Sequence, residues 1–88
     1  MSQPEVEYEE MTHSELRAYL KRLEVNLAAV RRRLKRFEAQ FGSTTDAMFA
    51  RLRPEEIEAS ADLSEWAGER EVLQRLEAQR DELAERLK

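Results

Sequence analysis

The chain has 88 residues, no cysteine and a formal net charge of −4, and 39% of its residues are charged. A chain of this length makes one domain with a modest core, because it buries only about 60% of the surface that it exposes when unfolded. Its composition is close to that of long helices and coiled coils, which argues against strands. The lack of cysteine excludes disulfides and thiolate metal sites, and no apolar run approaches the roughly 18 to 20 residues of a membrane span.

Residues 1–11 are predicted to form a disordered acidic tail. This segment holds one proline, four glutamates and few apolar side chains, so it cannot bury enough surface to offset the entropy of ordering. Its acidic start also differs from the basic and then apolar start of a signal peptide. We therefore expect a cytoplasmic protein with no membrane contact.

A long helix is predicted over residues 13–41. Thr12 is a good N-cap, and Glu15 completes a capping box. Apolar residues then recur at alternating steps of four and three, which defines a heptad seam. The seam residues are Leu16, Leu20, Leu23, Leu27, Val30, Leu34, Phe37 and Phe41. Such a long and narrowly striped helix needs another helix along its whole length.

Gly42 is expected to end the first helix, because glycine adopts the left-handed conformation at a helix end without steric cost. Ser43 then offers a new cap for a short helix over about residues 44–52. Pro54 limits that helix and can open one further turn of its own.

A third helix is predicted over about residues 63–87, with Asp62 as its N-cap. Two long amphipathic helices around a short connector predict an antiparallel hairpin, so residues 12–88 form a single all-α, coiled-coil-like domain. Apolar edges left over on this hairpin favour dimerisation into a helical bundle. In the hairpin, Trp66 is expected near the three phenylalanines Phe37, Phe41 and Phe49.

No residue pattern indicates catalysis or a bound cofactor. His13 is the only histidine, lies at the start of the first predicted helix and is interpreted as a solvent-exposed residue. Asp81, Glu82 and Glu85 lack the Glu-x-x-His pairs of di-metal bundles, so they are interpreted as a solvated face. A glycine-rich phosphate loop and a zinc-binding helix motif are both missing. We therefore expect no enzyme activity, no cofactor and no metal.

The basic run from Arg31 to Arg36 is the clearest candidate for contact with a charged partner. On a heptad, Arg32, Lys35 and Arg36 point outward and form a candidate basic patch. The charge of the run surrounds the helix instead of forming one stripe, and no aromatic residue is interleaved with it. A solvated face, paired in part with acidic residues of the third helix, is favoured over contact with nucleic acid.

The aromatic residues at the connector end have two interpretations. These residues are Phe37, Phe41, Phe49 and Trp66. They either cap the hydrophobic core, which is favoured, or form a docking patch for a protein partner. The charge also changes sign here, from a basic first helix to an acidic connector with Glu55, Glu56 and Asp62. These carboxylates are further candidates for partner contact.

Two segments, RFEAQFGSTTDAMFARL and DLSEWAGEREVLQRLEAQRDEL, resemble small prokaryotic two-helix proteins that are the antitoxin halves of type II toxin–antitoxin pairs. Those proteins show a phenylalanine, an aromatic–glycine pair, a serine or threonine with an acidic residue and a phenylalanine, and an acidic residue four positions before a tryptophan. The matching positions are Phe37, Phe41–Gly42, Ser43 to Asp46, Phe49, and Asp62 with Trp66. The resemblance covers about the last half of the chain, and Phe41 stands where tyrosine is expected.

The resemblance implies a protein that binds and blocks a cognate toxin enzyme, usually an endoribonuclease or a nucleotidyl-transfer-type toxin. The acidic connector is able to cover a basic RNA-binding groove on such a toxin. Two alternatives stay open: a structural coiled-coil protein that self-associates, and a nucleic-acid-binding helical protein that uses the basic run. A protein partner and a homo-oligomer, with a dimer favoured, are expected, whereas nucleic acid is not expected as a direct ligand.

Overall fold

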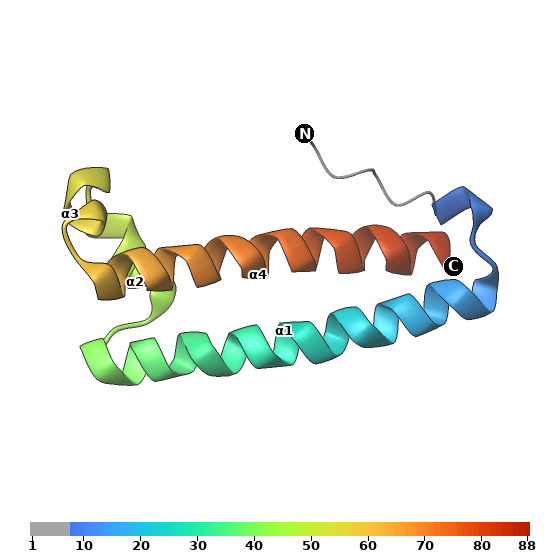
Figure 1. Ribbon diagram of the computed structural model, residues 1–88, viewed down its shortest axis with the longest axis horizontal. Helices are drawn as coiled ribbons and strands as arrows, with labels where there is room; N and C mark the ends of the chain where they lie inside the picture. The colour runs from blue at the N-terminus through green and yellow to red at the C-terminus, as the bar shows by residue number, and fades with distance from the viewer. Residues whose placement is uncertain (1–7) are drawn as a thin grey trace.

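The computed structural model describes residues 8–88, and over this range the chain is all-helical with no strand (Figure 1). A 3-10 turn, Tyr8–Glu10 (η1), precedes the first long helix, His13–Phe41 (α1). The connector holds two short helices, Thr45–Arg51 (α2) and Pro54–Glu58 (α3). The second long helix, Ala61–Arg86 (α4), runs back along α1 in the opposite direction. The prediction of an all-helical chain with one long helix packed against another is confirmed.

The two ends of α1 use the predicted capping residues. The Thr12 hydroxyl accepts the Glu15 backbone N–H at 3.1 Å, and the Glu15 carboxylate accepts the Thr12 N–H at 3.3 Å. At the other end, Gly42 has a φ of 65° and its N–H donates to the Glu38 carbonyl. A side chain at this φ would strain the backbone, so Gly42 allows the chain to turn back toward α4.

The core follows the seam between α1 and α4. The buried residues of the α1 seam are Leu16, Leu23, Leu27, Val30 and Leu34. Near the open end of the hairpin, Leu83 of α4 packs into a cluster with the first two of these leucines. Toward the connector, Trp66 and Met48 complete a second cluster with Val30 and Leu34. Burial of one such aliphatic side chain contributes about 1.5–3 kcal/mol, so the seam supplies most of the hydrophobic stabilisation.

The short helix α2 begins one residue later than predicted. Thr44, not Ser43, is its N-cap, and the Thr44 hydroxyl accepts the Ala47 N–H at 3.2 Å. The Ser43 hydroxyl instead donates to the Thr44 carbonyl at 3.0 Å. Both side chains are competent caps, so the residue types alone do not determine which of them accepts from the helix N–H groups.

The start of α4 also differs from the prediction. Ser60 is the N-cap, and its hydroxyl accepts the Leu63 N–H at 3.2 Å. The helix therefore begins at Ala61, and Asp62 lies within its first turn. A carboxylate in the first turn still interacts favourably with the helix dipole, which is why the sequence pattern around Asp62 looked like a helix start.

Replacement of Thr44 tests the cap of α2. Thr44→Ala should lower the free energy of unfolding by about 1 kcal/mol, because the Ala47 N–H loses its acceptor. Ser43→Ala should change it by less than about 0.5 kcal/mol. Urea denaturation followed by circular dichroism measures both, and a larger loss for the Ser43 variant would contradict the assignment.

The segment before α1 differs in part from the predicted acidic tail. Residues 1–7 of that prediction lie outside the described residues. In the rest, the Met11 N–H donates to the Tyr8 carbonyl at 3.1 Å, and Tyr8 is only 8% exposed. Tyr8 packs with Leu16, Leu23 and Leu83. The expectation of a tail up to residue 11 is thus corrected for this part, because the open end of the hairpin leaves apolar side chains that an aromatic ring can cover.

Candidate interaction surfaces

Trp66 lies at the centre of the aromatic cluster and is 0% exposed. Its ring stacks with Phe37 and Phe41 at centroid distances of 5.7 and 5.4 Å. Phe49 meets the same ring edge-on at 5.3 Å. These side chains come from α1, α2 and α4, so the cluster fastens the first connector helix to the hairpin. The predicted convergence of the four aromatic residues is confirmed.

A buried polar network holds α2 against this cluster. The Trp66 indole N–H donates to the Thr45 hydroxyl at 3.0 Å, and this hydroxyl donates to a Glu38 carboxylate oxygen at 2.9 Å. The same oxygen accepts the Thr45 backbone N–H at 2.7 Å. The buried donors are therefore satisfied, and the Glu38 carboxylate lies at the start of α2, where the helix dipole favours a negative charge.

The burial of Trp66 bears on the two interpretations of the aromatic residues. A side chain with no exposed surface offers no direct contact to a partner. Phe37, Phe41 and Phe49 are half-buried, with their inner faces packed on Trp66. The four residues therefore act first as core, and they position the connector that follows α1.

The acidic residues of the connector lie at the same end of the hairpin, on α3 and at the start of α4 (Figure 1). No residue of α3 is buried. The Glu55 side chain is 70% exposed and lies 3.7 Å from Arg53, while Glu56 accepts the Arg53 backbone N–H at 3.1 Å. Asp62 is exposed and accepts a hydrogen bond from the Gln40 amide at 3.3 Å.

The short helix α3 is nevertheless supported by the hairpin. Pro54 occupies its first position, where the missing N–H costs nothing. The Ser64 hydroxyl of α4 donates to the Ile57 carbonyl at 2.8 Å, close to the end of α3. The carboxylates of α3 are thus presented on a turn whose C-terminal end is hydrogen-bonded to α4.

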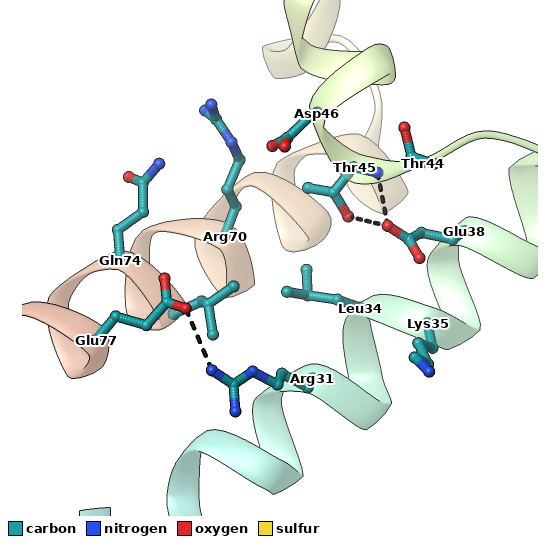
Figure 2. A pocket seen from close by; sticks show the side chains of 11 residues that line it. Arg31, Leu34, Lys35, Glu38, Thr44, Thr45, Asp46, Arg70, Gln74 and Glu77 are labelled. Carbon is teal, nitrogen blue, oxygen red and sulfur yellow. Dashed lines mark hydrogen bonds and ion pairs between the residues drawn. The ribbon is translucent and has the colours of Figure 1, made fainter. Parts of the chain in front are cut away.

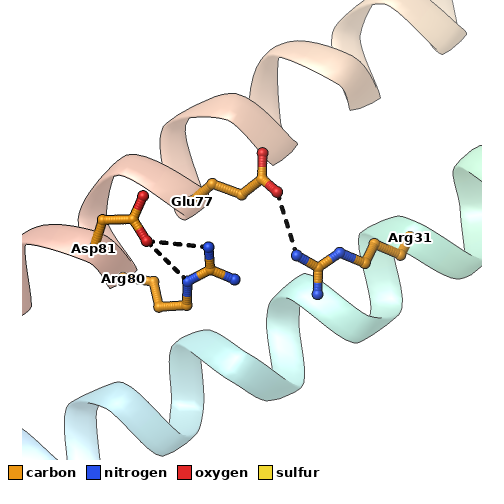
Figure 3. Close-up of polar contacts among 4 residues, drawn as sticks. All are labelled: Arg31, Glu77, Arg80 and Asp81. Atoms are coloured by element: carbon orange, nitrogen blue, oxygen red, sulfur yellow. Dashed lines mark hydrogen bonds and ion pairs between the residues drawn. The ribbon is translucent and has the colours of Figure 1, made fainter. Parts of the chain in front are cut away.

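Two arginines of the basic run pair across the hairpin. Arg31 lies 3.2 Å from Glu77 of α4 (Figure 3), and Arg33 lies 2.9 Å from Glu69. Further along α4, Arg80 pairs with its neighbour Asp81 at 3.0 Å. The prediction that part of the basic run pairs with acidic residues of the second long helix, α4, is confirmed.

The remaining members of the run form the candidate basic patch. Arg32, Lys35 and Arg36 are exposed on α1 and make no ion pair with another residue of the part of the chain that the structure describes. Their outward direction agrees with the heptad assignment. These cations are available to a partner. Arg36 lines a small hollow together with Glu65 of α4, and Lys35 lies along the groove beside α2.

A groove of ≈ 410 Å³ lies between α1, α2 and α4 (Figure 2). Leu34 and Leu73 supply its apolar lining. Its charged residues are Arg31, Lys35, Arg70, Glu38, Asp46 and Glu77. The Arg70 guanidinium lies 5.5 Å from the centre of the Phe49 ring, and its Nε is buried without an acceptor among the described residues. The two signs of charge are balanced here, so the groove favours neither an anion nor a cation.

The opposite end of the molecule is closed by Tyr8. Its ring meets Tyr19 edge-on at 6.1 Å, and the Arg86 guanidinium lies 5.2 Å from its centre. Burial raises the pKa of the Tyr8 hydroxyl above its ordinary value, and nearby Tyr19 and Glu82 act in the same direction, whereas Arg86 lowers it. The sequence signal for this contact was a lone aromatic residue in an acidic stretch, which was too weak to find it.

The fold and these surfaces define a small all-helical hairpin with a structured acidic connector and a basic first helix. No family of known proteins, no curated protein and no solved structure matches this chain. Within residues 8–88, no helix has the length and apolar character needed to cross a membrane. The same residues contain no group of three or more His, Cys, Asp or Glu side chains that could hold a metal ion.

Proposed function

We propose that the chain is a protein-binding module that neutralises an enzyme partner, as the antitoxin of a toxin–antitoxin pair. The observation that carries this proposal is the exposure of several carboxylates on a supported protrusion. Glu55, Glu56 and Glu58 lie on α3, which buries none of its residues. Asp62 and Glu65 continue the acidic surface onto α4.

The charge of the protrusion fits an enzyme that handles RNA or nucleotides. Such an enzyme has a basic groove that binds phosphates, and a row of carboxylates can occupy the same groove. Opposite charges also speed the encounter of the two proteins. Because α3 is already folded against α4, binding orders few additional residues, which lowers the entropic cost of association.

The aromatic cluster has an indirect role in this proposal. Phe37, Phe41, Phe49 and Trp66 are part of the resemblance to antitoxins, and in this chain they pack on one another. They hold α2 in place, and α2 leads into the acidic turn. The docking contacts come from the exposed carboxylates and not from the indole.

Co-expression with the product of the adjacent gene tests the proposal. The expected result is a stable complex that co-purifies, together with loss of the toxic activity of the partner. If the neighbouring gene encodes no enzyme that this chain binds and inhibits, the proposed function is wrong. The measurement does not depend on knowing the substrate of the partner.

Charge reversal on α3 tests the docking surface itself. Glu55→Lys/Glu58→Lys should weaken the complex by at least about tenfold, mainly through slower association that becomes less sensitive to salt. The matched control is Glu10→Lys/Glu24→Lys, which makes the same change of charge at exposed positions away from the connector. Surface plasmon resonance at two salt concentrations compares the variants. Equal losses of affinity in both variants would show that only net charge matters and that α3 is not part of the interface.

A further inference from the structure

The outer face of α1 has features that packing within the hairpin does not explain. Val25 is 64% exposed and is the one large hydrophobic residue that is exposed in the described part of the chain. Ala28, one turn away, is also exposed. Basic residues lie on both sides of this small apolar centre. They are Lys21, Arg22, Arg32, Lys35 and Arg36.

Most of these cations have no partner within the hairpin. Lys21, Arg32, Lys35 and Arg36 make no ion pair with any residue between 8 and 88. Arg22 lies 5.5 Å from the centre of the Tyr19 ring, which leaves its charge unbalanced. The helix as a whole carries eight basic against three acidic side chains.

The outer face of α4 is mainly acidic. The helix carries eight acidic against four basic side chains. Glu71, Ala78 and Glu85 are exposed at seven-residue spacing, so they share one face. Asp81 and Glu82 lie beside Glu85, and these three carboxylates form ion pairs with Arg80, Arg86 and Lys88 of the same chain. Such exposed pairs contribute little to stability, so a second copy can compete for the carboxylates. Ala78 and the exposed Arg75 thus lie between Glu71 and the acidic cluster, as Val25 and Ala28 lie between the two basic clusters.

The spacing along the two helices also matches. The basic clusters of α1 are 10 to 15 residues apart, and Glu71 is 10 to 14 residues from the acidic cluster at Asp81–Glu85. At a rise of about 1.5 Å per residue, both separations are roughly 15–22 Å. Two straight helices can therefore bring both pairs of clusters together at once.

We propose that the outer face of α1 binds the outer face of α4 of a second copy of this chain. The two faces point away from each other within one hairpin, because α1 and α4 pack together along their inner seams. One pair of copies therefore cannot use both contacts at once, and each pair leaves one basic and one acidic face free. The contact is heterologous and produces rows of copies instead of a closed dimer.

This association is weak and depends on salt. Exposed ion pairs contribute little individually, and the apolar centre of the contact is small. Opposite charges act mainly on the rate of encounter and on the choice of partner. Self-association is therefore expected at low ionic strength and high protein concentration, and salt should reverse it.

Sedimentation velocity of the full chain over a concentration series, at about 20 and about 300 mM salt, tests the proposal. The expected result is a weight-average mass that keeps rising past the dimer at low salt and returns toward the monomer at high salt. Arg32→Glu/Arg36→Glu should abolish the rise in mass. Arg51→Glu/Arg53→Glu makes the same change of net charge, but in the connector, and should retain the rise. Circular dichroism verifies that each variant is folded.

The acidic side is tested separately by Glu71→Arg/Glu85→Arg. This variant should also lose self-association, and an equimolar mixture with Arg32→Glu/Arg36→Glu should recover it, because each protein keeps a face complementary to the other. Three results would overturn the proposal: a monomer at every concentration, a closed dimer that salt does not affect, or unchanged association after reversal at Glu71 and Glu85. A monomer that binds a single-stranded RNA oligonucleotide through Arg32 and Arg36 would assign the basic face to nucleic acid instead.

Discussion

Trp66→Ala should lower the free energy of unfolding by about 3–5 kcal/mol, the largest loss expected from a single substitution in this chain. The side chain is 0% exposed and contacts three phenylalanines from two other helices. Its removal leaves a cavity between α1, α2 and α4 and also leaves the Thr45 hydroxyl without its buried donor. Because small domains are stable by only about 5–15 kcal/mol, this loss is a large share of the total stability.

Far-UV circular dichroism in urea measures this loss without relying on tryptophan fluorescence. Trp66→Phe is the matched control, because it keeps most of the apolar volume and loses the hydrogen bond to Thr45. It should be destabilised by about 1–2 kcal/mol. An alanine variant as stable as the wild type would show that the aromatic cluster is not the core of the connector end.

The same pair of variants separates stability from partner binding. Since Trp66 has no exposed surface, the folded Trp66→Phe protein should bind the partner of the proposed function with wild-type affinity. Trp66→Ala should lose binding only in proportion to its unfolded fraction. A large loss of affinity in a fully folded Trp66→Phe protein would show that the indole contributes to the interface.

The parts of the fold that depend on neighbours in sequence could be predicted. The seam from Leu16 to Phe41 was predictable because a heptad pattern determines which face of one helix is apolar. The capping box at Thr12 and the glycine at position 42 were predictable for the same reason, since each involves groups within four residues. Where two good caps stood close together, as at Ser60 and Asp62, local chemistry favoured neither.

The contacts that depend on the tertiary fold could not be predicted. Glu38 and Thr45 are ordinary surface residues in a sequence, and only the return of α2 beside α1 places them under the Trp66 indole. The choice between core and docking surface for Trp66 required the exposed fraction of its side chain, because both roles use the same residue type. Tyr8 was missed because the open end that it covers exists only after α4 has packed on α1.

Tyr8→Ala should lower the free energy of unfolding by about 2–3 kcal/mol. This loss is smaller than that expected for a central aromatic residue, because removal of the Tyr8 ring releases only a short segment. The ring is 8% exposed and covers Leu16, Leu23 and Leu83. Its loss exposes these leucines at the open end of the hairpin. Hydrogen exchange should therefore increase most in the first turns of α1 and the last turns of α4, while the connector end stays protected.

Tyr8→Phe is the control, because it keeps the ring contacts with Tyr19 and Arg86. Near neutral pH it should be within about 1 kcal/mol of the wild type. Urea denaturation gives the three stabilities. If the alanine variant matched the wild type, residues 8–11 would behave as the acidic tail that the composition suggests, and the contact with Leu83 would contribute nothing.

The hydroxyl of Tyr8 adds a dependence on pH that the phenylalanine variant lacks. Its pKa in the folded chain is raised, first by burial and then by Tyr19 and Glu82, with Arg86 opposing them. A raised pKa means that the stabilisation is complete below the unfolded value of about 10, and that it is lost as the pH rises through the folded value. Wild-type stability should therefore fall more steeply above pH about 10 than that of Tyr8→Phe, in which all other titrating groups are the same. Parallel curves for the two proteins would show that the Tyr8 hydroxyl is as well solvated in the folded chain as in the unfolded one.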